Sequence, residues 1–435
     1  MDKDNLIKIL NLWNYWDKEV SNLNHRTSYE NSISLFRQSR EVIVLKGIRR
    51  SGKSTLLNLE IKNLLEQGIN KENILFINFE EPNFINNLDI SFLDFIYETY
   101  LEYLKPKGKV YIFLDEIQNI KVWEKWVLRM YEKSDVQLYV TGSSSKLLSS
   151  EFSTALSGRH LSLDIMPLSF KEFLDFNNIK YDKKMDLISN QIRIKSLFNE
   201  YLNWGGFPKI LELKEDLLKK QELISYYDTI ILKDIGRRYE ISNIEDLRKL
   251  SFYFISNLSK LYSVNKLKNL NLGAYDTLKK YISYLKETYL LFDLQLFDFS
   301  VKKQMINLNK MYVIDTGLAN AIGFKFSEDK GRLLENLVFI ELKRRGKEIY
   351  YHKQKKECDF VIKEGLDIVQ AIQVTKSLED IDTKKREIAG LLDACKAYKL
   401  KTGLILTQDE EYEVEQEGVK IQVLPVWKWL LIENQ

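Results

Sequence analysis

The sequence has few of the residues on which several common kinds of site depend. It contains only two cysteines, Cys358 and Cys395, and three widely separated histidines, His25, His160 and His352. Two cysteines can build neither a disulfide framework nor a cysteine-rich zinc site, which is typical of a protein in a reducing cytosol. The sparse histidines also argue against a zinc hydrolase and against a Ser-His-Asp enzyme.

An excess of charge of one sign is also lacking, and so are long apolar runs. The 65 lysines and arginines nearly balance 62 acidic residues, which gives a formal net charge of +3. This balance excludes a protein that holds nucleic acid or membrane by bulk charge alone, although a local basic face remains open. No stretch approaches the roughly 18 apolar residues of a membrane span, and the N-terminus has no signal-peptide core. We therefore expect a soluble, cytoplasmic protein with no membrane partner.

The first part of the chain alternates short apolar runs with helical patterns. Such alternation predicts an α/β fold in which helices cover both faces of a parallel sheet. The predicted strands span residues 42–45, 74–79, 110–114 and 136–141.

The pattern changes twice beyond residue 170. A helical pattern is followed by helices and a two-stranded ribbon, at 290–297 and 304–314, which together predict a winged helix. After residue 330, a helix, three strands, a helix and two strands predict a second α/β domain. The chain is accordingly divided into four predicted regions, 1–170, 171–240, 241–330 and 331–435.

A glycine-rich motif follows the first predicted strand and precedes a helix. The segment Gly47-Ile48-Arg49-Arg50-Ser51-Gly52-Lys53-Ser54, with Thr55 after it, fits the pattern G-x-x-x-x-G-K-[ST]. Its glycines let backbone N–H groups surround a phosphate, and the helix N-terminus adds partial positive charge. Lys53 is expected to reach the β- and γ-phosphates and Ser54 to coordinate Mg²⁺. The alternative, a chance glycine-rich turn, is disfavoured by the flanking strand and helix.

Two adjacent acids end the predicted strand at 110–114. We expect Asp115 to hold Mg²⁺ beside Ser54, and Glu116 to polarise an attacking water. The alternative is a pair of solvated carboxylates at a strand end. The second acid favours hydrolysis over a small-molecule kinase, because in a kinase the nucleophile is the substrate's own hydroxyl.

Hydroxyl residues gather where the strand at 136–141 ends. Ser143 is the first candidate to hold the water or the γ-phosphate, and Thr141 is the second. The serines of this turn are equally suited to cap a helix at 146–148, and the two roles are compatible.

These motifs together resemble a known family. The segments GIRRSGKST, IFLDEIQN and VTGSSSKLL, then Leu156–Arg159, Pro167–Phe170 and Gly205–Pro208, are similar to AAA-type ATPases of archaea and bacteria. These ATPases carry a nuclease-like C-terminal domain of unknown function, and the resemblance covers nearly the whole chain. It implies ATP as the nucleotide. It also implies that Arg159 contacts the γ-phosphate of its own subunit or of a neighbour in an oligomer, with a stray surface arginine as the alternative.

The winged-helix region offers a candidate contact to double-stranded DNA. Lys279, Lys280 and Lys286 lie away from the apolar stripe of a predicted helix, and Lys302-Lys303 lie near the tip of the ribbon. Such lysines are suited to DNA phosphates. Winged helices also serve as protein–protein modules, so a protein partner remains open.

The last region resembles the restriction-endonuclease-like fold. Glu335, Asp359 and Gln373 follow the order of its site, which needs two acidic ligands for a divalent metal and a lysine that polarises water. Here Gln373 replaces an acid and Thr375 stands where the lysine belongs. Lys376 is one residue off and is expected to face the other way. We expect a fold that kept its shape and lost its chemistry.

The leading hypothesis is an ATP-hydrolysing protein that couples its nucleotide state to rearrangement of the winged-helix and nuclease-like domains. Its target would be DNA or a partner protein. Two alternatives stay open at this point. One is an ATP-gated, metal-dependent DNA nuclease, and the other is a nucleotide-dependent switch with negligible hydrolysis.

Overall fold

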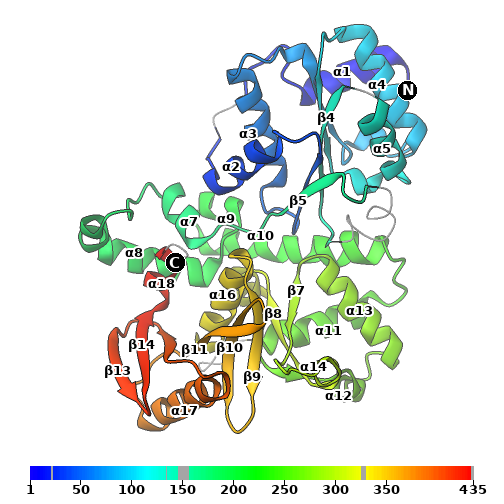
Figure 1. The fold of residues 1–435 in the computed structure, drawn as a ribbon. Coiled ribbons are helices and arrows are strands. Elements are labelled where there is room, and N and C mark those ends of the chain that lie inside the picture. The colour runs from blue at the N-terminus through cyan, green and yellow to red at the C-terminus, as the bar shows by residue number, and fades with distance from the viewer. Residues whose placement is uncertain (21–22, 134, 146–155, 325–329, 433–435) are drawn as a thin grey trace. The chain divides into compact units, whose positions relative to one another are not determined.

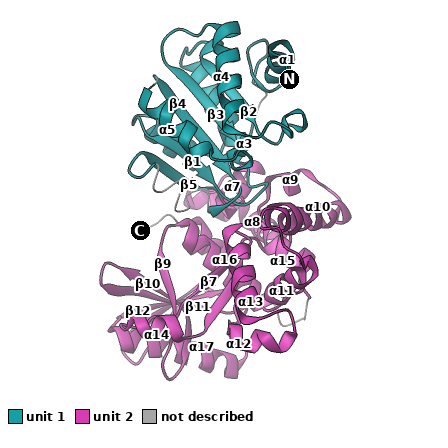
Figure 2. Ribbon diagram, turned by 90° about the vertical axis from the view of Figure 1, so that its right-hand side faces the viewer, with its two compact units in different colours: residues 1–165 teal, residues 166–435 magenta. Residues whose placement is uncertain are grey.

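The computed structural model describes residues 1–435 except 21–22, 134, 146–155, 325–329 and 433–435. The chain divides into two units, Met1–Ile165 and Met166–Gln435 (Figure 2), and each is described by itself. The helix predicted at 146–148 lies outside the described residues. Within the described residues, no helix combines the length and the apolar character needed to cross a membrane.

The first unit is built on one parallel sheet with the strand order β2-β3-β4-β1-β5. This arrangement confirms the predicted parallel sheet of an α/β fold. Its strands are β1 (Val42–Lys46), β2 (Ile74–Asn78), β3 (Val110–Asp115), β4 (Val136–Gly142) and β5 (His160–Asp164). Its helices are α1 (Lys3–Trp13), α2 (Thr27–Phe36), α3 (Lys53–Glu66), α4 (Ile90–Leu104) and α5 (Trp123–Lys133), with short turns η1 (Lys71–Asn73), η2 (Pro82–Phe84) and η3 (Ile117–Asn119).

Both faces of this sheet are covered by helices (Figure 1). Successive strand residues point to opposite faces, so the apolar run of β1 supplies two cores. Val42 and Val44 pack with residues of α1, α4 and α5. Ile43 and Leu45 pack with residues of α2 and α3. A strand buried on both sides explains why this segment is continuously apolar rather than alternating.

The segment after α1 completes the edge of the sheet at β2. The buried Asn14 side chain donates from Nδ2 to the carbonyl oxygen of Phe76 at 2.8 Å and accepts from the Phe76 N–H at 2.7 Å. One amide side chain therefore satisfies both backbone groups of an edge residue, which would otherwise be open to pairing with another strand.

The second unit begins with helices and carries two sheets. Its first helices are α7 (Phe170–Phe176), α8 (Lys184–Trp204), α9 (Pro208–Glu212) and α10 (Asp216–Thr229), followed by the π-helical η5 (Ile230–Arg237) and α11 (Ile244–Ser256). Next come β6 (Leu261–Tyr262), α12 (Val264–Leu267), η6 (Lys268–Leu270), α13 (Tyr275–Glu287), β7 (Leu291–Leu294), α14 (Val301–Ile306), β8 (Asn309–Val313) and α15 (Thr316–Ile322).

The nuclease-like part of this unit contains a six-stranded mixed sheet with the order β13-β14-β12-β11-β10-β9. The predicted order of a helix, three strands, a helix and two strands is present, with one further strand at Tyr412–Gln416 and one further helix at Val426–Leu431. Its elements are α16 (Lys330–Arg344), β9 (Glu348–Lys353), β10 (Glu357–Glu364), β11 (Asp367–Val374), α17 (Ile381–Tyr398), β12 (Thr402–Thr407), β13 (Tyr412–Gln416), β14 (Val419–Pro425) and α18 (Val426–Leu431).

The three-stranded sheet, β6-β8-β7, belongs to the predicted winged-helix region and is antiparallel throughout. The predicted ribbon is too long, because residues 304–308 are not strand. The short helix α14 forms here instead. The Ser300 hydroxyl accepts from the Lys303 N–H at 3.4 Å, and Gln304 donates to the Asp298 carbonyl at 2.6 Å. A helix cap and a side-chain hydrogen bond thus favour a short helix here over continued pairing between the two strands.

A buried aspartate joins distant segments of the second unit. The Gly206 N–H donates to Asp315 Oδ2 at 2.7 Å, and the Leu318 N–H donates to Oδ1 at 2.9 Å, which caps α15. Gly205 has φ +75°, and a Cβ built there would lie 2.0 Å from Asp315 Oδ1. Glycine at position 205 is therefore required by close packing as well as by its backbone angles.

Candidate active site

The phosphate-loop motif occupies the turn between β1 and α3. Gly47 has φ +153°, and a Cβ built on it would lie 2.1 Å from the Ile165 carbonyl oxygen, so only glycine fits. Lys53 is the first residue of α3 and is buried. Its ammonium donates to the carbonyl oxygens of Gly47 at 3.1 Å and Ile48 at 3.2 Å. The start of the loop is thus folded back onto the lysine near the end of the motif.

The predicted polar residues meet at the carboxyl ends of β3 and β4. The Ser54 hydroxyl donates to Asp115 Oδ2 at 2.8 Å, and the Thr141 hydroxyl donates to Asp115 Oδ1 at 2.5 Å. Thr141 also accepts from the Glu116 N–H at 2.9 Å. The Lys53 ammonium lies 3.5 Å from Glu116 Oε1. One hydrogen-bonded network therefore joins the start of α3 to the ends of two adjacent strands.

The two acids of this network have opposite electrostatic environments. Burial raises the pKa of Asp115, and the neighbouring Glu116 charge raises it further. Burial also acts to raise the pKa of Glu116, but Lys53 and Arg49 outweigh it and hold that pKa below its usual value. Of the two carboxyl groups, Glu116 therefore has the lower pKa, and a cation bound beside Asp115 would lower the pKa of Asp115.

The remaining motif residues lie around this network. Ile48 is fully buried, and the Arg49 guanidinium pairs with Glu80 at 2.8 Å. Arg50 has φ +67°, which fits the tight turn, and Thr55 lies in the first turn of α3. The backbone from Gly47 to Thr55 accordingly forms one continuous cradle.

Two residues at the site carry no role in the sequence analysis. Gln118, in η3, donates from Nε2 to Glu116 Oε2 at 2.5 Å and to the buried Ser143 hydroxyl at 3.4 Å. Arg26, just before α2, is buried and donates to the Ser51 carbonyl oxygen at 2.8 Å. Gln118 lies within the quoted segment IFLDEIQN, which was the available signal. Arg26 precedes the motif by more than twenty residues, and no local pattern marks it.

The site also contains polar atoms without hydrogen-bond partners, one in the loop and one in η3. Among the described residues, the buried Ser51 Oγ and Gln118 Oε1 have no hydrogen-bond partner. Buried polar atoms are normally paired, so an orphaned one calls for an explanation such as a bound ligand or water. A loop closed to side chains at Gly47, a buried lysine and unpaired polar groups together fit a polyphosphate with its metal ion.

Arg159 lies away from the phosphate loop. It directly precedes β5, and β5 pairs with β1 in parallel, with Val42 opposite His160. The loop follows the other end of β1, roughly 13 Å away at about 3.3 Å per residue. The guanidinium pairs with Glu132 of α5 at 2.8 Å. Contact of Arg159 with a γ-phosphate, in its own subunit or in a neighbour's, stays a prediction.

The predicted nuclease-like residues are only partly brought together. Glu335 on α16 and Asp359 on β10 both contact the ammonium of Lys310. Gln373 accepts from the Asp359 N–H at 3.3 Å, but its amide nitrogen donates to Glu387 of α17 at 2.5 Å. The Gln373 amide thus braces α17 against the sheet.

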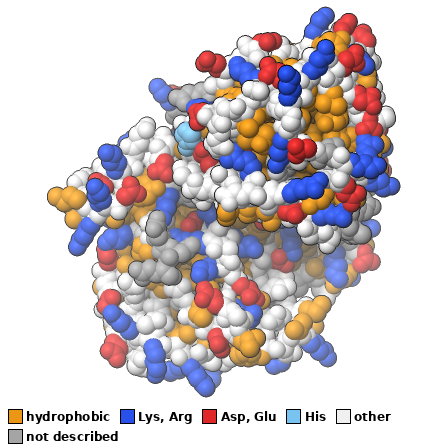
Figure 3. Space-filling view, turned by 45° about the horizontal axis from the view of Figure 1, so that its top comes forward, with side chains coloured by type: hydrophobic (Ala, Val, Ile, Leu, Met, Phe, Trp, Pro, Cys, Tyr) orange, Lys and Arg blue, Asp and Glu red, His pale blue; other side chains and the backbone are white. Residues whose placement is uncertain are grey.

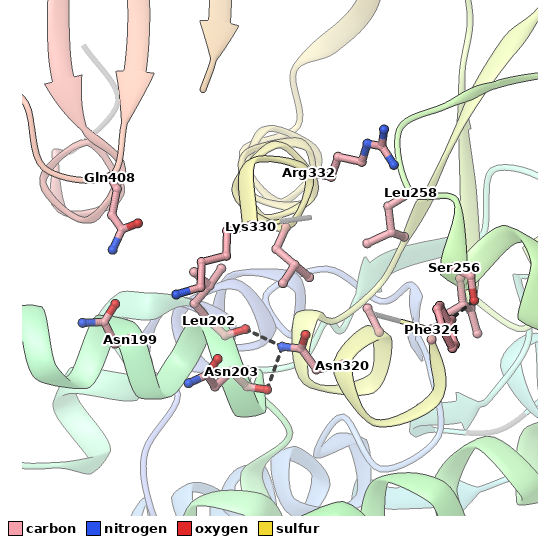
Figure 4. A pocket seen from close by; sticks show the side chains of 14 residues that line it. Asn199, Leu202, Asn203, Ser256, Leu258, Asn320, Phe324, Lys330, Arg332 and Gln408 are labelled. Atoms are coloured by element: carbon pink, nitrogen blue, oxygen red, sulfur yellow. Dashed lines mark hydrogen bonds between the residues drawn. The ribbon is translucent and has the colours of Figure 1, made fainter. Parts of the chain in front are cut away.

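A cavity of about 380 Å³ lies in the second unit (Figure 4). Its lining includes residues of α8, α11, α15 and the start of α16. The Asn320 amide points to the end of α8, where it donates to the carbonyl oxygens of Leu202 at 3.1 Å and Asn203 at 2.9 Å. At least this part of the polar lining serves to terminate a helix.

Comparisons with known proteins match successive parts of the chain. Residues 39–174 match the AAA domain family, and residues 195–329 and 330–429 match two domains of unknown function, DUF8612 and DUF4143. An uncharacterized protein of Methanocaldococcus jannaschii is 36% identical over 408 residues, which is 90% of this chain and 88% of that protein. An uncharacterized protein of Haemophilus influenzae is 31% identical over 93% of this chain and 98% of its own length.

Solved structures give weaker likenesses. The Walker-type ATPase PABY2304 of Pyrococcus abyssi has 13% identity and a TM-score of 0.44, covering 69% of this chain and 96% of that one. The Orc1 protein of Aeropyrum pernix, solved in complex with DNA, has 11% identity and a TM-score of 0.31, covering 69% and 92%. Likenesses at this level give no information on activity.

Proposed function

Because the chain belongs to the family of proteins that join an AAA domain to a DUF4143 domain, we propose that it binds ATP with Mg²⁺ and hydrolyses it. One observation carries this proposal. Lys53, Ser54, Asp115, Thr141 and Glu116 form a single network at the carboxyl edge of the sheet. Crevices at that edge are the usual ligand sites of parallel α/β sheets.

Each residue of the network has a distinct part in the proposed reaction. The loop N–H groups and Lys53 bind the β- and γ-phosphates, and Ser54 with Asp115 holds the metal. When bound, Mg²⁺ neutralises charge that develops on the phosphate oxygens. Glu116 takes up the proton of the attacking water. Gln118 keeps the Glu116 carboxylate in position, and Ser143 lies beside them.

The ammonium of Lys53 provides the direct test of nucleotide binding. Lys53→Ala is expected to weaken the affinity for ATP·Mg²⁺ by about 10- to 100-fold, because charge-assisted hydrogen bonds contribute about 1.5–3 kcal/mol. Phosphate release should fall to background. Affinity is measured by titration with a fluorescent ATP analogue, and turnover by release of inorganic phosphate.

The matched control is Lys62→Ala, on the same helix α3 but away from the loop. It should change neither quantity. If Lys53→Ala binds nucleotide as tightly as the wild type, the proposed site is wrong. If the wild type binds ATP but releases no phosphate, the nucleotide switch replaces the hydrolase.

We further propose that the target of ATP hydrolysis is double-stranded DNA, and that the protein contacts this DNA through α13. Lys279 and Lys280 are exposed on this helix, on the side away from its buried stripe of Leu278, Ile282 and Leu285. Lys286 is a poorer contact, because Asp293 pairs with it at 2.7 Å. The face in Figure 3 shows charges of both signs interspersed. A protein partner and action as an oligomer are the competing proposals.

Salt dependence tests the DNA contact. Each phosphate contact contributes about 0.9 to the slope of log K against log salt concentration, so Lys279→Ala/Lys280→Ala should reduce that slope by up to about 1.8. The measurement is binding of a 20-base-pair duplex at several NaCl concentrations. Lys286→Ala, on the same helix but paired with Asp293, should have the smaller effect. An unchanged slope in the double variant would favour a protein target.

A further inference from the structure

A buried lysine lies at the centre of the acidic cluster in the nuclease-like part. The Lys310 side chain is 3% exposed. Its ammonium lies 3.1 Å from Glu335 Oε1, 3.0 Å from Glu357 Oε1 and 3.0 Å from Asp359 Oδ1. An ammonium group has three hydrogen-bond donors, and here each has one carboxylate to face. The donors of the lysine are therefore fully used inside the cluster.

Three separate elements converge on this lysine. Lys310 and Tyr312 alternate along β8, so both side chains leave the same face of the three-stranded sheet. The Tyr312 hydroxyl donates to Glu335 Oε1 of α16 at 2.7 Å. Glu357 and Asp359 likewise alternate at the start of β10. The cluster thus links β8 to the helix and sheet of the nuclease-like part.

The carboxylates of the cluster have little capacity left for a metal. Asp359 Oδ1 faces Lys310, and Asp359 Oδ2 accepts from the Val374 N–H at 3.0 Å. Within the described residues, no group of three or more histidine, cysteine, aspartate or glutamate side chains is arranged to hold a metal ion. The residues present therefore do not fit the divalent metal that the nuclease-like fold implies.

We propose that Lys310 is the resident cation of this centre and takes the place of a divalent metal, which closes the centre to metal-dependent cleavage of DNA. The alternative is a catalytic lysine that has moved to another strand. A lysine that polarises water needs a donor directed at that water. Lys310 is buried and its donors are directed at three carboxylates, so it balances their charge instead. The centre then fastens β8 to α16 and β10.

Manganese binding to the full-length protein, measured without nucleotide, tests whether Lys310 takes the place of a metal. All proteins carry Ser54→Ala/Asp115→Asn, so that the phosphate-loop site contributes no metal signal. With Lys310 in place, electron paramagnetic resonance should detect no Mn²⁺ bound at this centre. Lys310→Met, which keeps an unbranched side chain one atom shorter and removes its charge, should bind Mn²⁺ at least tenfold more tightly. Addition of Asp359→Asn to Lys310→Met should abolish this gain.

The test does not depend on the Lys310 variant being stable. Mn²⁺ bound by the protein with Lys310 intact, and lost with Asp359→Asn, would overturn the proposal. Nicking of supercoiled plasmid in Mn²⁺ that disappears with Asp359→Asn would overturn it as well.

Chemical labelling provides a second measurement on the unaltered chain. Acetylation by acetic anhydride, followed by mass spectrometry, should modify the exposed Lys279 at least tenfold faster than Lys310. Equal rates at the two lysines would show that the ammonium is accessible and would contradict its place in the cluster.

Discussion

Glu116→Gln is expected to lower the rate of phosphate release from ATP by about 10²- to 10⁴-fold while leaving ATP affinity within about twofold of the wild type. Glutamine has nearly the same shape as glutamate but cannot take up a proton. The carboxylate it replaces lies 3.5 Å from the Lys53 ammonium and accepts from Gln118. Because Lys53 and Arg49 hold the pKa of Glu116 low, the wild-type side chain is charged at neutral pH. The measurement is single-turnover hydrolysis at saturating ATP·Mg²⁺.

A glutamate elsewhere on the same unit provides the control for this substitution. Glu66→Gln, at the exposed end of α3, removes one negative charge without touching the network and should leave turnover unchanged. Equal turnover in Glu116→Gln and wild type would remove Glu116 from the mechanism. The nucleotide switch would gain support if neither protein released phosphate while both bound ATP.

Gly205→Ala is expected to lower the free energy of unfolding of the full-length protein by about 3 kcal/mol or more. The Gly205 backbone (φ +75°, ψ −164°) lies in a region open essentially to glycine alone and costs an alanine about 1–3 kcal/mol, and forcing atoms into a filled space costs about 1–3 kcal/mol more. The new Cβ would lie 2.0 Å from Asp315 Oδ1. Displacing that carboxylate would also weaken its hydrogen bonds to the Gly206 and Leu318 N–H groups. Urea denaturation followed by circular dichroism measures the change.

Gly365→Ala provides a comparison in which alanine takes a positive φ without a steric clash. Gly365 has φ +61°, in the turn between β10 and β11, and a Cβ built there meets nothing within 4 Å. This variant should therefore lose only the backbone term, about 1–2 kcal/mol. Equal losses for the two alanine variants would mean that contact with Asp315 contributes little.

The first unit was predictable because its signals are local. A continuous apolar strand, a glycine-rich turn and a helix occupy adjacent residues, so their order alone indicates the fold. The strand β5 was not predicted, since its five residues are only partly buried at the sheet edge and give a weak pattern. Without β5, the sequence could not indicate at which end of a strand Arg159 lies.

The lysine of the nuclease-like centre was not predictable for a different reason. The nuclease-like pattern places its lysine on the strand of Gln373, at the position of Thr375. The structure instead supplies Lys310 from β8, 25 residues before Glu335 and 49 before Asp359. Only the packing of two sheets and a helix brings these residues together. The periodicity or spacing of residues along one element cannot predict such a contact. Glu335 and Asp359 were named in advance, because they lie on elements that the sequence pattern identifies, whereas Glu357 was not.

The N-terminal helices belong to the same folded unit as the AAA domain. The family match begins at residue 39, yet Leu6 and Leu10 of α1 belong to one core of the sheet, and Asn14 closes the β2 edge. Arg26 reaches the phosphate loop itself. A fragment trimmed to the matched region would expose apolar surface and an open strand edge, and it would free the loop from its upstream tether. For anyone who expresses or transplants this module, the segment before the recognised domain is therefore part of the folded unit.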